Sequence, residues 1–358
     1  MFRIKIDVPL LFGLLLLCVS SLFVLWSAGG ESSRIIINQA IRMGIAITVM
    51  IALAQIRPDT IFRWTPLLYT AGLIMLALVM VAGDVGKGAQ RWLDLGFVRF
   101  QPSEIMKLAV PTMVAWVITR KTLPPDFKNL VLASAVLILP CAFILVQPDL
   151  GTAILILMSG ALIIFLAGFS WRNILILLGL ALVLIPIAYI FVLEPYQQRR
   201  IQTLIDPWAD PLGSGYQIIQ SMIAIGSGGP QGKGWTQGSQ SQGDFIPDRH
   251  TDFIFSVFSE EMGFIGVLLL ITLYVAIVAR GLYIAYYTKD TFSRLLAGSL
   301  SMTFFFYVFV NIGMVAGMLP VVGVPLPLIS YGGTSMVTLM AGFGILMGIH
   351  NHRSLMSR

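Results

Sequence analysis

The chain has 358 residues, of which 57% are hydrophobic and only 11% are charged, with a net charge of +6 and a mean hydropathy of +0.87. An average soluble domain carries about 25% charged residues. The composition therefore excludes an ordinary soluble domain and places the chain among membrane proteins.

Apolar runs of the length that crosses a bilayer recur from one end of the chain to the other. They predict an all-α, polytopic membrane protein, a single integral membrane domain over 1–358, with a large extracytoplasmic loop at 194–251 between helices 7 and 8. The first run is too long for a signal peptide and is expected to be retained. The ten expected transmembrane helices are 8–28, 35–55, 64–83, 103–119, 129–147, 150–168, 173–193, 252–279, 295–319 and 334–350.

Three other segments do not have the pattern of a spanning helix. Residues 83–104 are mixed and amphipathic, and residues 215–229 are apolar but interrupted by glycines. The stretch 319–335, "LPVVGVPLPLISYGGTS", contains prolines that a continuous helix does not accept. Non-helical backbone at membrane depth persists only where protein or water covers it. We therefore expect 320–333 to be a re-entrant or cavity-lining loop.

Lysines and arginines between the predicted helices indicate the orientation of the chain. They favour the side that holds both termini, so we expect both termini in the cytoplasm. A second group of basic residues lies on the opposite side, where the rule disfavours them. An anionic ligand outside the cell would explain this group, and so would pairing with acids of the same loop. Most of its members fall in two outer segments: Lys87, Arg91, Arg99, Arg199, Arg200, Lys233 and Arg249.

Ionisable residues inside predicted spans are candidates for a functional site, because burying them in a bilayer is costly. Glu104 and Lys107 in "QPSEIMK" are spaced i, i+3 and share one face of the fourth span. They are either functional groups or a structural ion pair. Arg42 lies in the outer half of the second span and needs a carboxylate partner or a route to the interface.

Two outer turns give weaker signals. Asp149 in "VQPDLGTA" is interpreted as a helix N-cap or as the lining of an outer cavity. The glycine-rich stretch 226–235, "GSGGPQGKGW", does not fit the Walker A motif, because Ser227 and Gly234 occupy positions that require other residues. Glycine-rich backbone beside one lysine can still bind an anion.

The stretch "IPDRHTDFIFSVFSEE" at 246–261 passes from a charged loop into the eighth span. If that helix begins near Thr251, Asp252 lies in its first turn, where the helix dipole favours a negative charge. Asp252 is then a cap, a partner of Arg249, or a carboxylate that faces an outer cavity. Glu260 and Glu261 lie deeper in the span, and we expect them to pair with a buried cation, of which Arg42 is the first candidate.

Taken together, the motifs resemble the SEDS family (shape, elongation, division and sporulation) over essentially the whole chain. The stretch 319–335 and the short N-terminus favour its RodA-like members over FtsW-like or SpoVE-like ones. The motifs that carry the resemblance are "QRWLDLG" (90–96), "QPSEIMK" (101–107), "QPDLGTA" (147–153), "GYQIIQSMIAIGSGG" (215–229), "RHTDFIF" (249–255) and "LPLISYGGTS" (326–335).

The resemblance implies a peptidoglycan glycosyltransferase. Such an enzyme polymerises lipid II, a disaccharide peptide linked to undecaprenyl diphosphate, at the outer face of the bacterial plasma membrane during cell elongation. The implied partners are a class B penicillin-binding protein, the elongation machinery and membrane lipid, and no nucleic acid. Asp252 matches the family's essential aspartate in the long outer loop, and Glu104 and Lys107 match its charged pair.

This combination gives a mechanistic hypothesis with Asp252 as the general base. No cofactor is certain, a divalent cation (magnesium or manganese) is left open, and its ligands are unknown. The alternatives are a flippase that carries lipid II across the membrane and a non-catalytic activator of a penicillin-binding protein. The residues expected to bind substrate are Glu104, Lys107, Arg91, Arg199, Arg200, Lys233 and Arg249.

Overall fold

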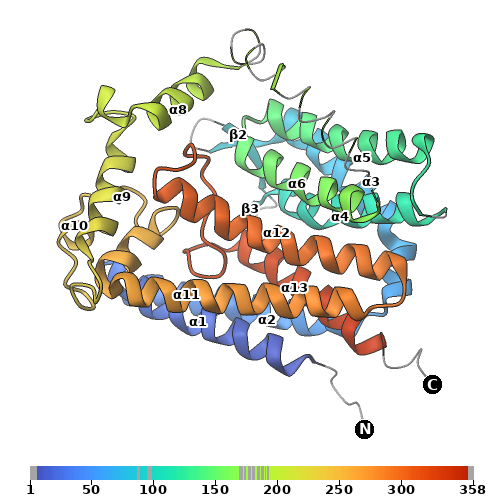
Figure 1. The fold of residues 1–358 in the computed structure, drawn as a ribbon, viewed down its shortest axis with the longest axis horizontal. Helices are drawn as coiled ribbons and strands as arrows, with labels where there is room; N and C mark the ends of the chain where they lie inside the picture. Colours follow the sequence, from blue (N-terminus) through green and yellow to red (C-terminus); the bar gives the residue numbers. More distant parts are fainter. Residues whose placement is uncertain are drawn as a thin grey trace.

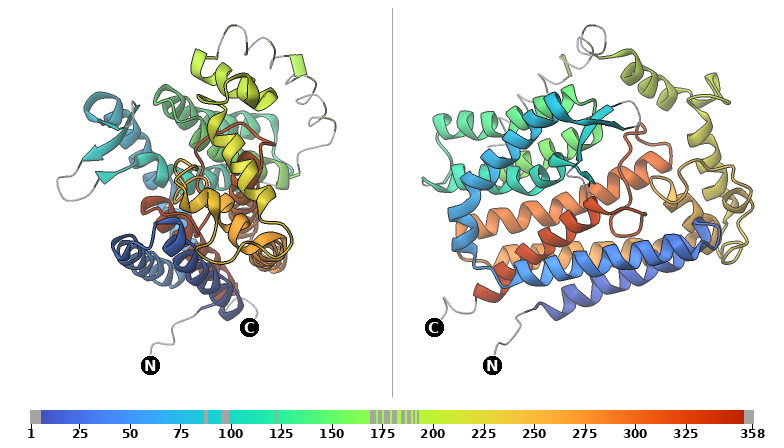
Figure 2. Two further views of the ribbon diagram at one scale, coloured as in Figure 1. Left: turned by 90° about the vertical axis from the view of Figure 1, so that its left-hand side faces the viewer. Right: turned by 180° about the vertical axis from the view of Figure 1, so that it is seen from behind.

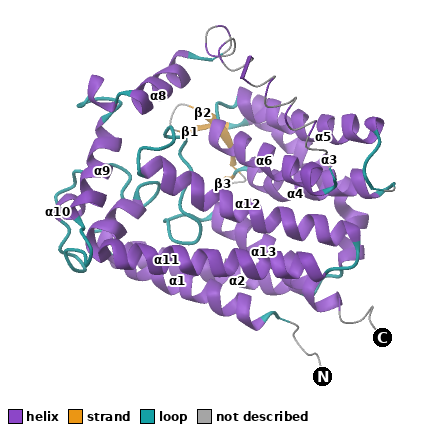
Figure 3. Ribbon diagram, viewed as in Figure 1, coloured by secondary structure: helices purple, strands orange, loops and turns teal. Residues whose placement is uncertain are grey.

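The computed structural model describes residues 6–86, 89–94, 99–121, 123–168 and 193–353, with scattered positions between 172 and 191. Helices dominate these ranges, as Figure 3 shows, and the expected all-α fold class is confirmed. The long helices are α1 (Val8–Ala28), α2 (Ser33–Ala54), α3 (Pro58–Ala82), α4 (Pro102–Thr119), α5 (Phe127–Val146), α6 (Leu150–Leu166), α11 (Ile254–Tyr287), α12 (Thr291–Val315) and α13 (Thr334–Arg353).

These long helices correspond to nine of the ten predicted spans. In the described part of the chain, six of them are both long and apolar enough to cross a membrane, namely α1, α2, α3, α5, α11 and α12, and α6 is a shorter apolar helix. The predicted seventh span, 173–193, falls largely outside the described residues, so the count of ten stays a prediction.

The helices form two groups on either side of α12 and α13 (Figure 1). One group contains α1, α2 and α11, and the other contains α3, α4, α5 and α6. Helix α12 packs against α11 on one side and against α4 and α6 on the other, while α13 packs mainly along α2. Helix α12 is therefore the central element through which the two groups contact each other.

Close helix contacts depend on small residues. In lipid, burial of apolar surface does not drive helices together, so they associate by close van der Waals packing and hydrogen bonds. At Gly13 of α1, an added Cβ would lie 2.9 Å from Ile277 Cγ1 of α11. At the α12–α6 contact, buried Ser299 donates a hydrogen bond of 2.7 Å to the Ser159 carbonyl.

Helix α1 begins and α13 ends at the same end of the bundle, which we call the terminal end (Figures 1 and 2). The elements between 195 and 253 lie at the opposite end, which we call the loop end. These elements are α8 (Pro195–Ile205), η1 (Pro207–Ala209), α9 (Tyr216–Ser227) and α10 (Ser239–Gln242).

The mixed segment after α3 forms a small antiparallel sheet that the sequence did not predict. Its strands are β1 (Asp84–Gly86), β2 (Ala89–Asp94) and β3 (Arg99–Phe100), in the order β1-β2-β3. The sheet packs against α3 and the start of α4.

Two details of the predicted eighth span were wrong. Helix α11 begins at Ile254, so Asp252 lies in the turn before the helix and not in its first helical turn. The helix is also interrupted at Gly263, whose φ of 64° and ψ of −169° are not helical. The N–H groups of Phe264 and Ile265 donate instead to the Gly229 and Pro230 carbonyls, at 2.9 and 3.1 Å. The glycine-rich stretch therefore completes the hydrogen bonding at the break.

The segment between α12 and α13 is non-helical, as expected. Its residues Val324, Leu326 and Ile329 are nevertheless buried. We call residues 320–333 the re-entrant loop. It brings polar backbone into the interior of the bundle, where other parts of the protein satisfy it.

A buried ion pair closes the terminal end. Asp7 caps α1 by accepting from the Leu10 N–H at 2.9 Å, and it accepts from Arg280 of α11 at 2.6 Å. His350 Nε2 of α13 lies 3.4 Å from the same carboxylate. Burial raises the pKa of Asp7, but hydrogen bonds from Arg280 and Leu10 and the nearby positive charges outweigh it, so the pKa lies below its ordinary value.

We predict that Asp7→Ala lowers the free energy of unfolding by roughly 2–4 kcal/mol, because a cap is lost and a buried charge pair is broken. Asp126 is a matched control, since it also caps a helix and pairs with a lysine, but in an exposed position. Asp126→Ala should cost clearly less. Thermal unfolding of the purified protein in detergent measures both, and equal losses would contradict the prediction. Because the pKa of Asp7 is lowered by folding, its contribution should be present above the ordinary carboxyl pKa and lost at lower pH.

Candidate functional site

Asp252 lies in the turn 250–253 at the loop end, directly before α11, and this turn rests against the re-entrant loop. The Tyr331 N–H donates to the His250 carbonyl at 2.8 Å. Ser330 Oγ donates to the Thr251 carbonyl at 2.6 Å. On the opposite part of the loop, a methyl group added at Gly323 would lie 3.6 Å from Asp252 Oδ2. The carboxylate therefore lies beside the loop backbone, half-buried.

The predicted pair of Glu104 and Lys107 forms within α4. Lys107 Nζ lies 2.7 Å from Glu104 Oε1, and both side chains are almost fully buried. Lys107 Nζ also lies 5.4 Å from the ring centre of Tyr307 on α12. In the part of the chain that the structure describes, Glu104 Oε2 is buried without a hydrogen-bond partner. Glu104 and Lys107 thus form a buried ion pair, and the second carboxylate oxygen of Glu104 accepts no hydrogen bond from the described residues.

The turn between α5 and α6 lies next to the start of α4. Asp149 caps α6 by accepting from the Thr152 N–H at 3.2 Å, so the predicted N-cap is confirmed. Its other oxygen accepts from Gln101 Nε2 at 3.1 Å. Arg91 of β2 donates to the Gln147 carbonyl at 3.0 Å and also to the Pro148 carbonyl. Arg91 is therefore a half-buried cation that braces this turn.

The re-entrant loop connects these groups. The Val322 carbonyl lies where a side chain at Gly151 would be, so the loop contacts the start of α6 closely. Val324 packs against Tyr307, whose ring lies beside Lys107. Through this loop, the turn that carries Asp252, the Arg91-braced turn and the Glu104–Lys107 pair border a common region of the protein.

The other basic residues expected to bind substrate have partners elsewhere. Arg249 pairs with Asp244 at 2.8 Å and donates to the Ser241 carbonyl. Arg199 and Arg200 lie on α8, away from the start of α11 (Figure 1). Hydrogen bonds from Ser214 hold the pKa of Asp210 below its usual range, and the positive charge of Arg199 adds to this effect. Substrate binding by these arginines stays a prediction.

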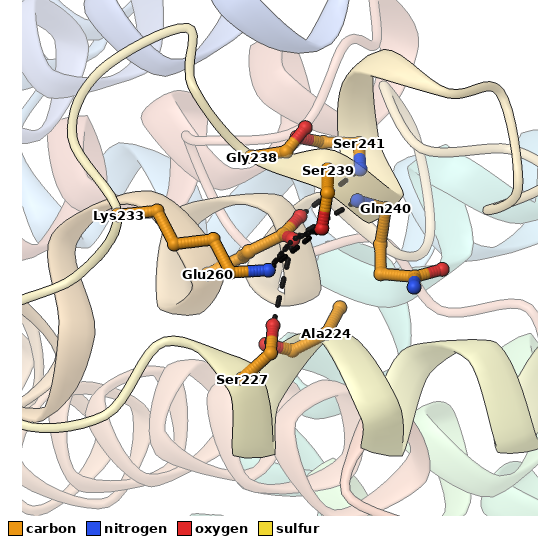
Figure 4. A network of polar contacts seen from close by, with 8 residues as sticks. All are labelled: Ala224, Ser227, Lys233, Gly238, Ser239, Gln240, Ser241 and Glu260. Carbon is orange, nitrogen blue, oxygen red and sulfur yellow. Dashed lines mark hydrogen bonds and ion pairs between the residues drawn. The ribbon is translucent and has the colours of Figure 1, made fainter.

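Glu260 does not pair with Arg42, and that expectation was wrong. Its fully buried carboxylate accepts from Lys233 Nζ at 2.8 Å and from the backbone N–H groups of Gln240 and Ser241 at 2.9 and 3.0 Å. Figure 4 shows these groups, together with Ser227 and Ser239, converging on the carboxylate. Charge-assisted hydrogen bonds of this kind make a buried carboxylate tolerable. Lys233 thus has a structural partner, and its role in substrate binding stays a prediction.

Glu261 is also satisfied without Arg42. Its carboxylate accepts from the Ser27 hydroxyl at the end of α1, and Gln242 Nε2 donates to the same serine at 3.0 Å. The two adjacent glutamates therefore fasten the loop end to α11 and α1, which explains why this apolar helix carries two acids.

The glycines between 226 and 235 serve close packing. A side chain at Gly228 or Gly232 would overlap the carbonyls of Ser259 or Glu261 in α11. The Lys233 and Gly234 N–H groups donate to the Glu260 and Glu261 carbonyls at 3.0 and 3.1 Å. This contact between a loop backbone and a helix backbone accounts for the glycine content that resembled an anion-binding loop.

An apolar groove with Arg42 at one end is the feature that the sequence did not reveal. Its volume is about 1130 Å³. The guanidinium of Arg42 lies over the Tyr331 ring, 4.5 Å from its centre, and among the described residues no carboxylate pairs with it. The sequence indicated this site only through a single arginine in an apolar span, and the aromatic partner of Arg42 could not be assigned from the sequence. Groove-lining residues come from α2, α3, α4, α13 and the small sheet, among them Leu53, Trp64, Leu108, Thr338 and Ile345.

Among the described residues, no cluster of three or more histidines, cysteines, aspartates or glutamates could hold a metal ion. Magnesium bound with a diphosphate substrate needs only one or two carboxylates. The divalent cation considered from the sequence therefore stays open, and no step below depends on it.

Comparison with known proteins gives consistent results along the whole chain. The family model of the cell cycle proteins FtsW, RodA and SpoVE matches residues 1–355. The peptidoglycan glycosyltransferase MrdB of Escherichia coli K12 is 50% identical over 360 residues, covering 99% of this chain and 96% of the relative. The probable peptidoglycan glycosyltransferase FtsW of Aliivibrio salmonicida is 33% identical, covering 95% of this chain and 86% of the relative.

Solved structures have the same fold. A chain from a peptidoglycan synthase complex that coordinates polymerization and crosslinking superposes with a TM-score of 0.86 at 33% identity, covering 98% of this chain and 99% of that chain. The rod shape determining protein RodA of Thermus thermophilus superposes with a TM-score of 0.72 at 28% identity, covering 97% of both chains.

The Glu260 network predicts a local change when its charge is removed. In Glu260→Gln the Lys233 ammonium loses its counter-ion, and opening of segment 233–243 should become easier by roughly 2 kcal/mol or more. Limited trypsin digestion after Lys233 should then be at least ~10-fold faster, since about 1.4 kcal/mol corresponds to a factor of ten. Asp244→Asn is the control, because this exposed acid directly follows the segment and pairs with Arg249 instead of Lys233. Similar digestion of the two variants would contradict a clamping role for Glu260.

Proposed function

The chain belongs to the FtsW, RodA and SpoVE family of cell cycle proteins, and we propose that it polymerises lipid II with Asp252 as the general base. It is a RodA-like peptidoglycan glycosyltransferase of the plasma membrane that crosses the bilayer several times. The observation that carries the site assignment is the re-entrant loop, which borders both the Asp252 turn and the buried Glu104–Lys107 pair.

The proposed step is an inverting glycosyl transfer between two lipid II molecules. Asp252 takes the proton of the acceptor sugar 4-hydroxyl, and the oxygen attacks the anomeric carbon of the donor sugar. The bond from that carbon to the phosphate oxygen breaks, and its electron pair leaves with the lipid diphosphate. Asp252 suits the role because it is half-buried and lies at the loop end, before the helix begins. A positioned base of this kind contributes about 10²–10⁴ to the rate.

Cations near the re-entrant loop would stabilise the departing diphosphate. We propose Lys107 and Arg42 for this role, with Arg91 nearby. Lys107 is buried and held by Glu104 at 2.7 Å, so its charge is fixed in a region of low dielectric. Arg42 has no carboxylate partner among the described residues and is available as a planar fork for phosphate oxygens. Glu104 would orient Lys107.

The apolar groove supports the proposal that the substrate enters from the bilayer. Arg42 and Leu53 both line it, and they are about 16 Å apart along α2 by helical rise. A diphosphate at Arg42 would therefore allow part of the polyprenyl chain to lie along α2 and α13. This arrangement fits a substrate with an anionic head and a long hydrocarbon tail.

The orientation and the partner complete the proposal. We place both termini in the cytoplasm and Asp252 outside, because lysines and arginines favour the terminal side and the loop end is opposite. The similarity to a chain from a peptidoglycan synthase complex supports a partnership with a class B penicillin-binding protein during elongation. The partner would crosslink the strands that this chain makes.

We predict that Asp252→Asn lowers the rate of glycan polymerisation about 10²–10⁴-fold, because the base is removed while the side-chain shape is kept. The assay uses the purified protein with its partner in proteoliposomes, with lipid II supplied only to the outer leaflet. Asp248→Asn is the matched control, since Asp248 is a nearby exposed acid with a positive φ that asparagine accepts.

A folded Asp252→Asn variant with a near wild-type rate would contradict the base assignment. Absence of polymer from the wild-type protein in the same one-sided assay would favour a flippase, which makes no glycan. Absence of polymer once the partner lacks any glycosyltransferase domain would favour a non-catalytic activator.

The groove predicts a separate effect on substrate binding. Thr338→Trp places an indole in the groove and should raise the KM for lipid II roughly 10-fold, or about 1.4 kcal/mol, with a smaller effect on kcat. A lipid II analogue with a short chain should be affected less. Leu132→Trp on the exposed face of α5 is the control. An equal effect on long and short chains would show that the groove does not bind the tail.

A further inference from the structure

We propose that Asn311 of α12 is a positioning residue that holds Asp252 at a fixed place relative to Lys107. The inference rests on the proposed role of Asp252 as general base. Asn311 was not singled out from the sequence, although a lone asparagine in an apolar span is a signal in itself.

Asn311 makes two hydrogen bonds that join separate parts of the chain. Its side chain is 0% exposed. Nδ2 donates to the Asp252 carbonyl at 2.9 Å and to the Val324 carbonyl at 2.7 Å. One amide group therefore ties the turn before α11 to the re-entrant loop, and it does so from a third element, α12.

The bond from Asn311 completes a set of three. The carbonyls of His250, Thr251 and Asp252 each accept a hydrogen bond, from the Tyr331 N–H, the Ser330 hydroxyl and the Asn311 amide respectively. Two of these donors belong to the re-entrant loop. Three consecutive carbonyls fixed in this way determine the backbone of the turn and therefore the direction in which the Asp252 side chain leaves it.

The face of α12 that carries Asn311 also contacts Lys107. Tyr307 and Asn311 are spaced i, i+4, so they lie on one face of the helix, about 6 Å apart along its axis. The Tyr307 ring lies 5.4 Å from Lys107 Nζ and packs against Val324. Helix α12 thus contacts the Asp252 turn through Asn311 and Lys107 through Tyr307, and so sets the separation between the base and the ammonium group.

The unsatisfied oxygen of Asn311 supports a positioning role. Among the described residues, Asn311 Oδ1 is buried and accepts no hydrogen bond. A buried acceptor without a partner costs stability. The need to satisfy its own polar groups therefore does not explain why an asparagine occupies this position. The two carbonyls that accept from its Nδ2 group do explain it.

The test compares Asn311→Ala with Ser299→Ala in the purified full chain with its partner, using lipid II polymerisation. Both variants remove a buried hydrogen bond made by α12, but Ser299 bonds to the Ser159 carbonyl in α6. We expect Asn311→Ala to lower kcat about 10²-fold, as small misplacements of a reacting group do, with KM for lipid II changed less than about twofold. Ser299→Ala should keep kcat near wild type. The limb of the kcat-versus-pH profile that reports the base should shift in Asn311→Ala only.

Asn311→Asp and Ser330→Ala provide independent readouts. Asn311→Asp keeps the shape but loses the amide donor, so it should remain slow at neutral pH. Ser330→Ala removes one of the three hydrogen bonds to the turn and perturbs the fold less. It should lower kcat with little change in the KM for lipid II, and it can be measured even if Asn311→Ala does not fold.

The inference would be overturned if folded Asn311→Ala, or Ser330→Ala in its place, kept kcat and the pH profile of the wild type. It would also be overturned if Asn311→Ala and Ser299→Ala lost activity equally. Asp252→Asn measured in parallel separates this failure from failure of the proposed base: an active Asp252→Asn refutes the base itself, whereas an inactive Asp252→Asn with an active Asn311→Ala refutes only the positioning role.

Discussion

Peptide groups inside a membrane-embedded bundle must find hydrogen-bond partners within the protein, because the bilayer offers none. Most of the chain meets this constraint by forming helices, but the re-entrant loop cannot. Four of its carbonyls therefore accept hydrogen bonds from side chains of four different helices. The donors are Ser21 of α1 to Ile329, Gln39 of α2 to Ser330, Tyr274 of α11 to Pro327 and Asn311 of α12 to Val324. This requirement draws α1, α2, α11 and the central helix α12 around one short segment, and the candidate site forms beside it.

Buried charged residues also need partners within the protein, and leaving a charge unpaired costs more free energy than leaving a peptide group unpaired. Burying an unpaired charge is expensive, so each buried acid in the described part of the bundle accepts at least one hydrogen bond. Asp7 has Arg280, Glu104 has Lys107, and Glu260 has Lys233 and two backbone N–H groups. These ion pairs lie at the terminal end, at the candidate site and at the loop end respectively. The first joins α11 to the start of α1, the second lies within α4, and the third joins α11 to the glycine-rich stretch. Arg42 differs, because an aromatic ring replaces the carboxylate.

The sequence allowed prediction of features that depend on neighbouring residues. Apolar runs predicted the existence of the described long helices, although α3 begins at Pro58 instead of 64 and α11 ends at Tyr287 instead of 279. The prolines predicted the re-entrant loop, and the i, i+3 spacing predicted the Glu104–Lys107 pair. Features that depend on distant parts of the chain were missed. Glu260 was paired with the wrong cation because Lys233 reaches it only after the glycine-rich stretch folds onto α11. The break at Gly263 was invisible for the same reason, since the carbonyls that stabilise it come from residues 229 and 230.

The break in α11 also has a mechanical consequence. The segment between Ile254 and Gly263 is a short helix with the Asp252 turn at one end and the helix break at the other. Glu260, near the break, joins this short helix to the stretch 233–241 through an ion pair and hydrogen bonds. A change in the position of that stretch would therefore be passed through Glu260 to the segment that follows the Asp252 turn, without involving the part of α11 after Gly263.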